Sequence, residues 1–110
     1  MEHHDLLSGF IRLHILHHAV EGELYGKWMI DELGRHGYSL SPGTLYPMLR
    51  RLETRGYLVS RLERDGQTVR KFYRATPAGA KALSIARNKA KELFGEIVPR
   101  RPSKRARRSR

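Results

Sequence analysis

Cysteine is absent from this 110-residue sequence, which excludes disulfide bonds, thiolate nucleophiles and cysteine-based zinc sites. Long apolar runs are absent too. Residues 13–20 carry no formal charge but include three histidines, and the longest uncharged stretch, residues 36–49, is still shorter than the roughly 20 residues that a membrane span needs. The N-terminus lacks the basic start of a signal peptide. We therefore expect a cytoplasmic protein without membrane attachment.

Acidic residues are scarce, with 11 Asp and Glu against 22 Lys and Arg, and the net charge is +11. The excess is uneven because residues 99–110 hold seven of the basic residues and no acid, which leaves residues 1–98 with a net charge of +4. Such a balance predicts a polyanionic partner, with nucleic acid ahead of a membrane surface. Residues 99–110 have no apolar periodicity, so we expect a disordered basic tail.

The motifs of an enzyme are also missing, since the sequence contains no nucleophile motif, no phosphate-cradling glycine loop and no cluster of carboxylates. We expect neither an enzyme nor a bound cofactor. A chain of this length forms one small domain that buries only about 60% of its unfolded surface. Association with a second copy would therefore add useful burial.

Residues 39–58 form the most informative segment. Four apolar residues in it recur at i, i+3, i+4 and i+7, which places them on one buried face of a helix. They are Leu45, Met48, Leu49 and Leu52. Ser41 and Pro42 are typical of a helix start, but Pro47 would then lie beyond the first turn and bend the helix. A start at Gly43 or Thr44 removes this conflict, and we favour it.

Two helical patterns precede this segment and a strand pattern follows it. Residues 5–21 are apolar over much of a helix circumference, and a second helix is expected from about Tyr25 to His36, with Tyr25 facing the core. Residues 57–64 and 69–75 suit two strands, and Asp65-Gly66 between them predicts a hairpin. Basic residues lie along this hairpin and favour a polyanion. They are Arg61, Arg64, Arg70, Lys71 and Arg74.

The last predicted helix begins after Thr76, an expected N-cap, with Pro77 in its first turn. A stripe of apolar residues follows 3,4,3,4 spacing, which is typical of a helix that packs lengthwise against another. The stripe consists of Leu83, Ala86, Ala90, Leu93 and Ile97. Because the three earlier helices can form the core by themselves, we expect this stripe to face a second subunit.

This order predicts a mainly α fold with a β-hairpin wing, a winged helix-turn-helix followed by a C-terminal dimerisation helix. The expected parts are the DNA-binding domain at residues 5–76, the dimerisation helix at 77–98 and the tail at 99–110. In such folds the third helix enters the DNA major groove. Gly43 and Thr44 are small enough for close approach, and Ser41, Thr44 and Tyr46 can donate hydrogen bonds. Arg50 would contact a guanine or a phosphate.

Three motifs resemble the PadR-like family of bacterial transcriptional regulators. They are LYG at 24–26, LSPGTLYPMLRRLETRGYL at 40–58 and KFYRATPAG at 71–79. The resemblance covers roughly residues 6–95 and is closest to the short subfamily with a single C-terminal helix. It implies a homodimeric winged-helix repressor whose last helix packs against the first helix of the partner. The expected partners are double-stranded DNA with a palindromic operator and a small-molecule or metal effector.

The resemblance also implies which residues form each surface. The expected DNA-binding residues are Ser41, Gly43, Thr44, Tyr46, Pro47, Arg50 and Arg51 on the third helix, with Arg64, Gln67, Arg70 and Lys71 on the wing. The expected dimer interface contains Phe10, Leu83, Ala86, Ala90, Leu93, Phe94 and Ile97. Some family members hold planar drugs between tryptophans of the terminal helix. This chain departs from that pattern, because its one tryptophan, Trp28, lies on the second helix.

Six histidines in the chain are a surplus, and three of them share the first helix. His14 and His18 have the i, i+4 spacing that can present two imidazoles to one metal ion, with Glu21 three residues further on. Alternatively, these histidines are polar positions near the dimer interface, or they respond to pH.

Two other function classes remain open at this stage. One is a small metal-dependent enzyme that uses the histidines, and the other is a non-specific nucleic-acid packaging protein driven by the basic tail. A sequence-specific DNA-binding repressor is the leading interpretation.

Overall fold

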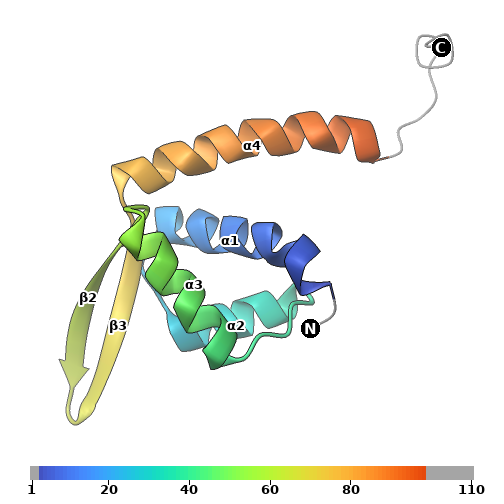
Figure 1. The fold of residues 1–110 in the computed structure, drawn as a ribbon. Coiled ribbons are helices and arrows are strands. Elements are labelled where there is room, and N and C mark those ends of the chain that lie inside the picture. The colour runs from blue at the N-terminus through green and yellow to red at the C-terminus, as the bar shows by residue number, and fades with distance from the viewer. Residues whose placement is uncertain (1–2, 99–110) are drawn as a thin grey trace, which may run out of the picture.

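Four helices and a small antiparallel sheet alternate along residues 3–98, the part of the chain that this computed structural model describes (Figure 1). The helices are α1 (His4–Glu21), α2 (Gly26–Arg35), α3 (Pro42–Thr54) and α4 (Pro77–Ile97), and the strands are β1 (Leu24–Tyr25), β2 (Leu58–Asp65) and β3 (Thr68–Ala75). This order confirms the predicted mainly helical fold with a hairpin wing. The basic tail, predicted to be disordered, lies outside the described residues.

The sheet has the strand order β1-β3-β2. The long hairpin pairs Leu58 with Ala75 at its base and Asp65 with Thr68 at its tip, which leaves a two-residue loop. Gly66 in that loop has a φ of 64°, a left-handed conformation that glycine adopts without strain. The predicted hairpin is thus confirmed at the predicted turn.

Strand β1 was not predicted. Tyr25 was expected to begin the second helix, but it pairs with Phe72 of β3, and the helix begins at Gly26. A two-residue strand is too short to show any periodicity in the sequence. It forms because a partner strand far along the chain offers free backbone groups beside it.

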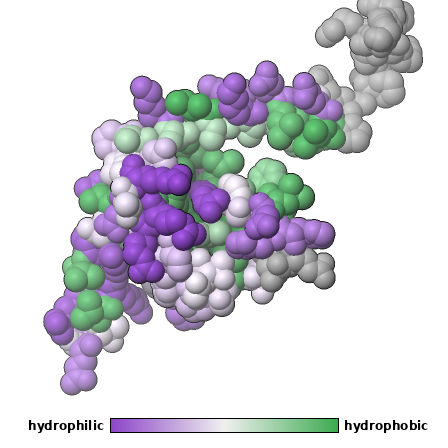
Figure 2. Space-filling view, viewed as in Figure 1, coloured by the Kyte–Doolittle hydropathy of each residue, from purple (hydrophilic) through white to green (hydrophobic). Residues whose placement is uncertain are grey.

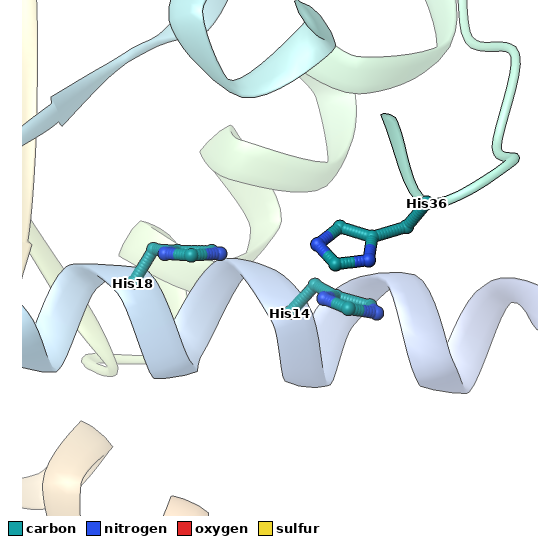
Figure 3. Close-up of side chains that lie close together, drawn as sticks. All are labelled: His14, His18 and His36. Atoms are coloured by element: carbon teal, nitrogen blue, oxygen red, sulfur yellow. The ribbon is translucent and has the colours of Figure 1, made fainter. Parts of the chain in front are cut away.

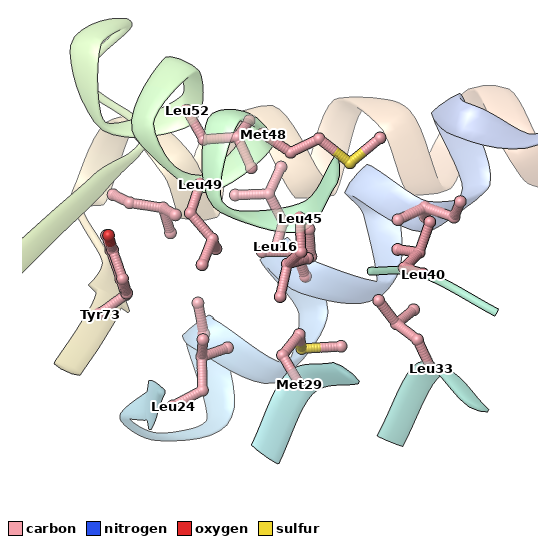
Figure 4. Packing of buried hydrophobic residues seen from close by; sticks show 14 of the residues in the cluster. Leu16, Leu24, Met29, Leu33, Leu40, Leu45, Met48, Leu49, Leu52 and Tyr73 are labelled. Atoms are coloured by element: carbon pink, nitrogen blue, oxygen red, sulfur yellow. The ribbon is translucent and has the colours of Figure 1, made fainter. Parts of the chain in front are cut away.

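The core is centred on the predicted apolar face of α3 (Figure 4). Its four residues, Leu45, Met48, Leu49 and Leu52, are at most 5% exposed. Helix α1 contributes Ile11, Ile15, Leu16 and Ala19 to the same core. Other apolar residues of α1, which the periodicity also picked out, remain open, with Leu6 76% and Phe10 47% exposed. Helix α1 therefore has one buried face and a second apolar surface that stays open among the described residues.

Helix α3 begins at Pro42 with Ser41 as N-cap, so the later start that we favoured from the sequence is wrong. Pro47 lies inside the helix. A proline at this position removes the hydrogen bond to the carbonyl of Gly43, four residues earlier. Because Gly43 is exposed, water can hydrate that carbonyl. Burial of Leu45 and Met48 on either side of Pro47 keeps the helix continuous.

Helices α2 and α3 end in the same way, with a glycine in the left-handed conformation. Gly37 has a φ of 91° and Gly56 a φ of 86°. The next residue then bonds back into the helix, from Tyr38 N to Leu33 O and from Tyr57 N to Leu52 O, both at 2.9 Å. These are Schellman caps, which fix the direction in which the chain leaves each helix.

The start of α4 is joined to the end of α3 through the TPAG motif. The Thr76 hydroxyl accepts a 3.0 Å hydrogen bond from Gly79 N and donates one to the carbonyl of Gly56. A Cβ on Gly79 would lie 2.1 Å from the carbonyl oxygen of Tyr57, so only glycine allows this approach. The first turns of α4 are therefore firmly attached, and the helix then continues alongside α1 (Figure 1).

Among residues 3–98, no helix has the length and apolar character to cross a membrane.

Candidate nucleic-acid interface

The face of α3 opposite the core is open to solvent along its whole length. Ser41, Gly43, Tyr46, Arg50 and Arg51 are exposed, and the predicted contacts Thr44 and Pro47 are half-buried. Within the described residues, Arg50 and Arg51 have no hydrogen-bond or ion-pair partner. Figure 2 shows hydrophilic residues gathered over α3 and the neighbouring hairpin. The structure thus brings all the predicted residues of α3 to one accessible surface.

The N-terminus of α3 presents two hydroxyl groups beside the backbone amide of Gly43, since Pro42 has no N–H and the amides of Thr44 and Leu45 bond to the carbonyl of Ser41. Ser41 Oγ and Thr44 Oγ1 lie 3.3 Å apart, and the Ser41 side chain makes no capping bond to the backbone. A helix N-terminus carries unpaired N–H groups and the positive end of the helix dipole. This corner of the protein can therefore bind a phosphate oxygen.

Tyr46 lies against the backbone at the start of α2. A Cβ on Gly26 would lie 2.1 Å from Tyr46 Cε1, so the ring occupies the space that any larger residue would need. Gly43 is different, because a Cβ there would meet nothing nearer than Ser41 Oγ at 3.7 Å. The fold requires glycine at position 26 but not at position 43.

A groove of about 430 Å³ separates α3 from the hairpin. Its walls hold three tyrosines and four cationic side chains. The lining residues are Tyr25, Gly26, Lys27, Tyr46, Arg50, Val69, Arg70, Lys71 and Tyr73. Sequence reasoning missed Tyr25 and Lys27 as members of this site. The LYGK sequence at the start of α2 contains both, but only the pairing of β1 with β3 brings them to the hairpin.

The basic residues of the hairpin are not equivalent. Arg61 donates two 2.7 Å hydrogen bonds to the two carboxylate oxygens of Glu23 and a third, also 2.7 Å, to Glu63. The hydrogen bond from Arg61 lowers the pKa of Glu23, and the same bond raises the pKa of Arg61. Arg61 is thus engaged within the protein, and the interpretation that all five hairpin cations favour a polyanion is wrong for this one.

The other predicted hairpin residues are held less tightly by carboxylates than Arg61 is. The Arg70 guanidinium lies 4.7 Å from the centre of the Tyr25 ring, which holds it over the groove. Lys71 Nζ is 3.8 Å from Glu53 Oε1, a loose and partly exposed ion pair. Arg64 and Gln67 lie exposed at the hairpin tip, and within the described residues Arg64 has no ion-pair partner.

The expected dimer surface is largely unoccupied, with one exception. Leu83 is 7% exposed and belongs to the core of its own protomer, so its side chain has little left to offer a partner. The remaining apolar residues are open, with Leu93 47%, Phe94 62% and Ile97 64% exposed. Ala86 is half-buried and Ala90 exposed. Ala86, Ala90 and Leu93, together with Phe10 of α1, border a groove of about 500 Å³ between α1 and α4.

The histidines form a different group from the one that the sequence predicted. His14 and His18 come together with His36, the residue that ends α2, and not with Glu21 (Figure 3). Glu21 instead groups with His17 and His18. Burial, followed by the charges of His36, His18 and His17, lowers the pKa of His14. His36 was missed because it is 22 residues from His14 and only the packing of α2 on α1 makes them neighbours.

Comparison with known proteins gives consistent matches over this fold. The family model described as transcriptional regulator PadR-like family matches residues 15–85. The transcriptional regulator Rv3488 of Mycobacterium tuberculosis is 52% identical over 88 residues, which cover 80% of this chain and 82% of that protein.

Solved structures agree with the architecture. A PadR family transcriptional regulator from Eggerthella lenta has 31% identity and a TM-score of 0.76, with 84% of this chain and 82% of that chain covered. A transcriptional regulator from Clostridium thermocellum has 27% identity and a TM-score of 0.74, with coverage of 90% and 100%.

Proposed function

Because this chain belongs to the PadR-like family of transcriptional regulators, we propose that it is a homodimeric repressor that binds a palindromic operator in the bacterial cytoplasm. An effector would release it from the DNA. The family and the relatives are transcriptional regulators and not enzymes.

One observation carries this proposal, the open outer face of α3. Ser41 and Thr44 stand at the end that would enter the major groove first, and Arg50 lies about two turns after Gly43 on the same side of the helix. A major groove about 12 Å wide admits one helix, and its base edges and phosphates accept hydrogen bonds from such side chains. We assign the two hydroxyls to phosphate or base-edge contacts and Arg50 to a guanine or a phosphate. Gly43, Tyr46, Pro47 and Arg51 complete the surface.

The hairpin would act as a wing beside the recognition helix. Arg64 and Gln67 at its tip and Arg70 and Lys71 on β3 would follow the DNA backbone or enter the minor groove. The cationic groove between α3 and the hairpin supports this placement, because a phosphate strand fits between two basic walls.

The uncovered apolar surface of α1 and α4 supports a dimer. Large exposed apolar patches on small proteins usually mark an interface. In a two-fold dimer built on this surface, the two recognition helices would contact half-sites about 34 Å apart, one turn of DNA. The proposed parts are then a DNA-binding domain at residues 5–76, a dimerisation helix at 77–98 and the basic tail.

The variant Arg50→Ala tests the recognition surface. If Arg50 reads a base, its removal should weaken operator binding by about 1–3 kcal/mol and leave binding to random DNA much less affected. Footprinting on the gene's own promoter would first identify the operator, and fluorescence anisotropy would then measure both affinities. Arg35→Ala is the control. It also removes one positive charge, but at the end of α2 that is away from the groove.

An equal loss on operator and random DNA would reassign Arg50 to a phosphate contact. If Arg50→Ala binds the operator as tightly as the wild type, the recognition surface proposed for α3 is wrong.

A further inference from the structure

We propose that His14, His18 and His36, together with Glu32, form a binding site for a divalent transition-metal ion of the Zn²⁺ class between α1 and the end of α2. The site lies away from the groove between α3 and the hairpin. Through its position it would make operator binding responsive to metal, and this regulatory part rests on the function proposed above.

The three imidazoles already converge. One ring nitrogen from each of the three histidines lies within 4.8 Å of the others. The rings of His14 and His36 have centroids 4.7 Å apart, and those of His14 and His18 are 6.5 Å apart with planes only 16° from parallel. Figure 3 shows two rings on successive turns of α1 and the third reaching them from the end of α2.

Glu32 lies beside two of these histidines, His18 and His36, and is a neighbour of the group whose ligand atoms all lie within 4.8 Å. Its Oε2 atom is 3.2 Å from His36 Nε2 and 3.5 Å from His18 Nε2, and its side chain is only 14% exposed. One carboxylate oxygen between two imidazoles can serve as a fourth ligand, or it can orient the rings as a hydrogen-bond acceptor. The carboxylate also supplies the negative charge that a divalent cation needs in a half-buried place.

The donor set determines the class of metal. Three imidazoles and a carboxylate, without any thiolate, suit zinc, nickel or cobalt, whereas manganese and magnesium prefer oxygen ligands. Zinc–nitrogen bonds of 2.0–2.1 Å at tetrahedral angles place ligand nitrogens roughly 3.3 Å apart. Side-chain rotations that bring the ligand nitrogens closer together by about an ångström would complete the site.

The backbone beneath the cluster is well fixed, which favours binding. His14 and His18 project from a continuous stretch of α1, and His36 is the cap residue of a Schellman motif closed by Gly37. His36 is exposed while Glu32 and His18 are largely covered, so an ion can reach the site from solvent. Ligands on rigid elements lose little conformational entropy on binding.

A competing group of ligands lies next to this one. His17, His18 and Glu21 also have ligand atoms within 4.8 Å, but all three come from α1, and the side chains of His17 and Glu21 are 47% and 63% exposed. This group lacks a ligand from a second element and a covered carboxylate. His36 and His17 therefore distinguish the two sites, because each belongs to only one of them.

The position of His36 gives the site a consequence for DNA binding. The segment from His36 to Ser41 connects α2 directly to the N-terminus of α3. A metal ion bound to His36 and to α1 would fix this connection relative to the helix that packs against α4. Metal occupancy would thereby change the position of α3, and through it the affinity for the operator.

Isothermal titration calorimetry of the metal-free protein with ZnCl₂, NiCl₂ and MnCl₂ tests the site without DNA. Wild-type protein should bind zinc with a Kd below about 10 µM, and manganese more weakly. His36→Ala and Glu32→Gln should each weaken zinc binding by about 10–100-fold. His17→Ala and the distant control His4→Ala should stay within about threefold. Circular dichroism would confirm that each variant remains folded.

Zinc binding weaker than about 10 µM in the wild type would overturn the proposal. So would a His36→Ala protein that binds zinc as the wild type does, or a loss confined to His17→Ala, which would move the metal to the competing group.

The regulatory part needs a second measurement. Operator affinity with and without zinc should differ at least fivefold for wild-type protein and not for His36→Ala. Unchanged operator affinity in the presence of bound zinc would overturn the regulatory part alone. Failure of the metal-free protein to bind any operator would instead count against the proposed function and leave the metal site standing.

Discussion

At the scale of single residues, two glycines near the recognition surface serve different needs. Gly26 is required by packing, since the Tyr46 ring lies where a side chain would be. Gly43 lies in open space and has no positive φ, so no contact within residues 3–98 requires a glycine there. A glycine inside a helix is destabilising relative to alanine by about 0.5–1 kcal/mol. We infer that Gly43 is small because a partner approaches closely there.

Gly43→Ala therefore should separate stability from DNA binding. The free energy of unfolding should stay the same or rise by up to about 1 kcal/mol. Operator affinity should fall at least fivefold, about 1 kcal/mol, because the new methyl group occupies space that the DNA needs. Urea unfolding and anisotropy on the same preparation measure the two quantities.

Gly26→Ala is the matched comparison. Its methyl group collides with Tyr46 inside the protein, so this variant should lose stability as well as operator affinity. Operator binding that is unaffected by Gly43→Ala would remove the close contact proposed at that position.

Glu23, which directly precedes strand β1, is bonded to Arg61 of the hairpin strand β2. Two parallel 2.7 Å hydrogen bonds connect the guanidinium and the carboxylate. Bidentate pairs of this kind have a defined geometry as well as attraction, although exposure to solvent limits their contribution. Arg61 thus ties the hairpin to Glu23 through a defined pair of hydrogen bonds.

The stability contributed by this pair should depend on pH. The pKa of Glu23 is below its ordinary value of 4.5 because Arg61 donates hydrogen bonds to the charged form. A lowered pKa means that the contribution is present above pH 4.5 and is lost as the pH falls through the lower, folded-state value. Glu23→Gln should therefore lower the urea midpoint at pH 7, and the difference from wild type should shrink in acid.

Glu96→Gln is the control for this comparison. Glu96 is exposed near the end of α4 and has no ion-pair partner within residues 3–98. A Glu23→Gln midpoint that matches the wild type at pH 7 would show that the pair does not stabilise the wing.

At the scale of elements, helix α4 has two parts, one attached to the domain and one exposed to solvent. Its first turns are attached to the domain through Thr76, Gly79 and the buried Leu83. The rest presents Leu93, Phe94 and Ile97 to solvent, each nearly half exposed or more. Only the second part is available to a partner.

Leu93→Glu should dissociate the proposed dimer. A charge at this exposed position should cost the protomer little, within about 0.5 kcal/mol, but would be unpaired and desolvated in an apolar interface. Sedimentation velocity should then give the mass of a monomer. Lys81→Glu, an exposed charge reversal on the opposite side of α4, should leave the dimer intact.

Leu83→Glu cannot be used for this purpose, although the sequence suggested it. Leu83 is in the protomer core, so a glutamate there should unfold the domain and not only the dimer. An unchanged dimer mass for Leu93→Glu would refute the interface proposed on α4.

At the scale of the whole molecule, positive charge is divided between a structured surface and the basic tail. The tail holds seven basic residues, and residues 1–98 carry a net charge of +4. Phosphate contacts raise affinity for every DNA sequence and make it dependent on salt, whereas base contacts produce the preference for an operator.

Deletion of residues 99–110 should lower affinity for operator and random DNA alike and flatten the dependence on salt. The preference for the operator, roughly 10³-fold or more, should persist because α3 and the wing are intact. Binding titrations over a range of salt concentrations measure both effects. Loss of the preference together with the tail would favour a packaging protein over a repressor.

The sequence by itself determined the order of the helices and the hairpin, the buried face of α3 and the outer face opposite it. These features depend on local periodicity and on the helix and turn signals at Gly56, Asp65-Gly66 and Thr76, which involve only neighbours along the chain. The family motifs lie in the same segments, so the residues proposed to contact DNA follow from the sequence.

Only the tertiary structure decided which distant residues meet. It paired Tyr25 with Phe72, placed Lys27 in the groove, engaged Arg61 with Glu23, and brought His36 to His14 in place of Glu21. It also continued α3 through Pro47, because core burial outweighs one lost hydrogen bond. Contacts between elements depend on how the elements pack in three dimensions, and no spacing along the chain records that packing.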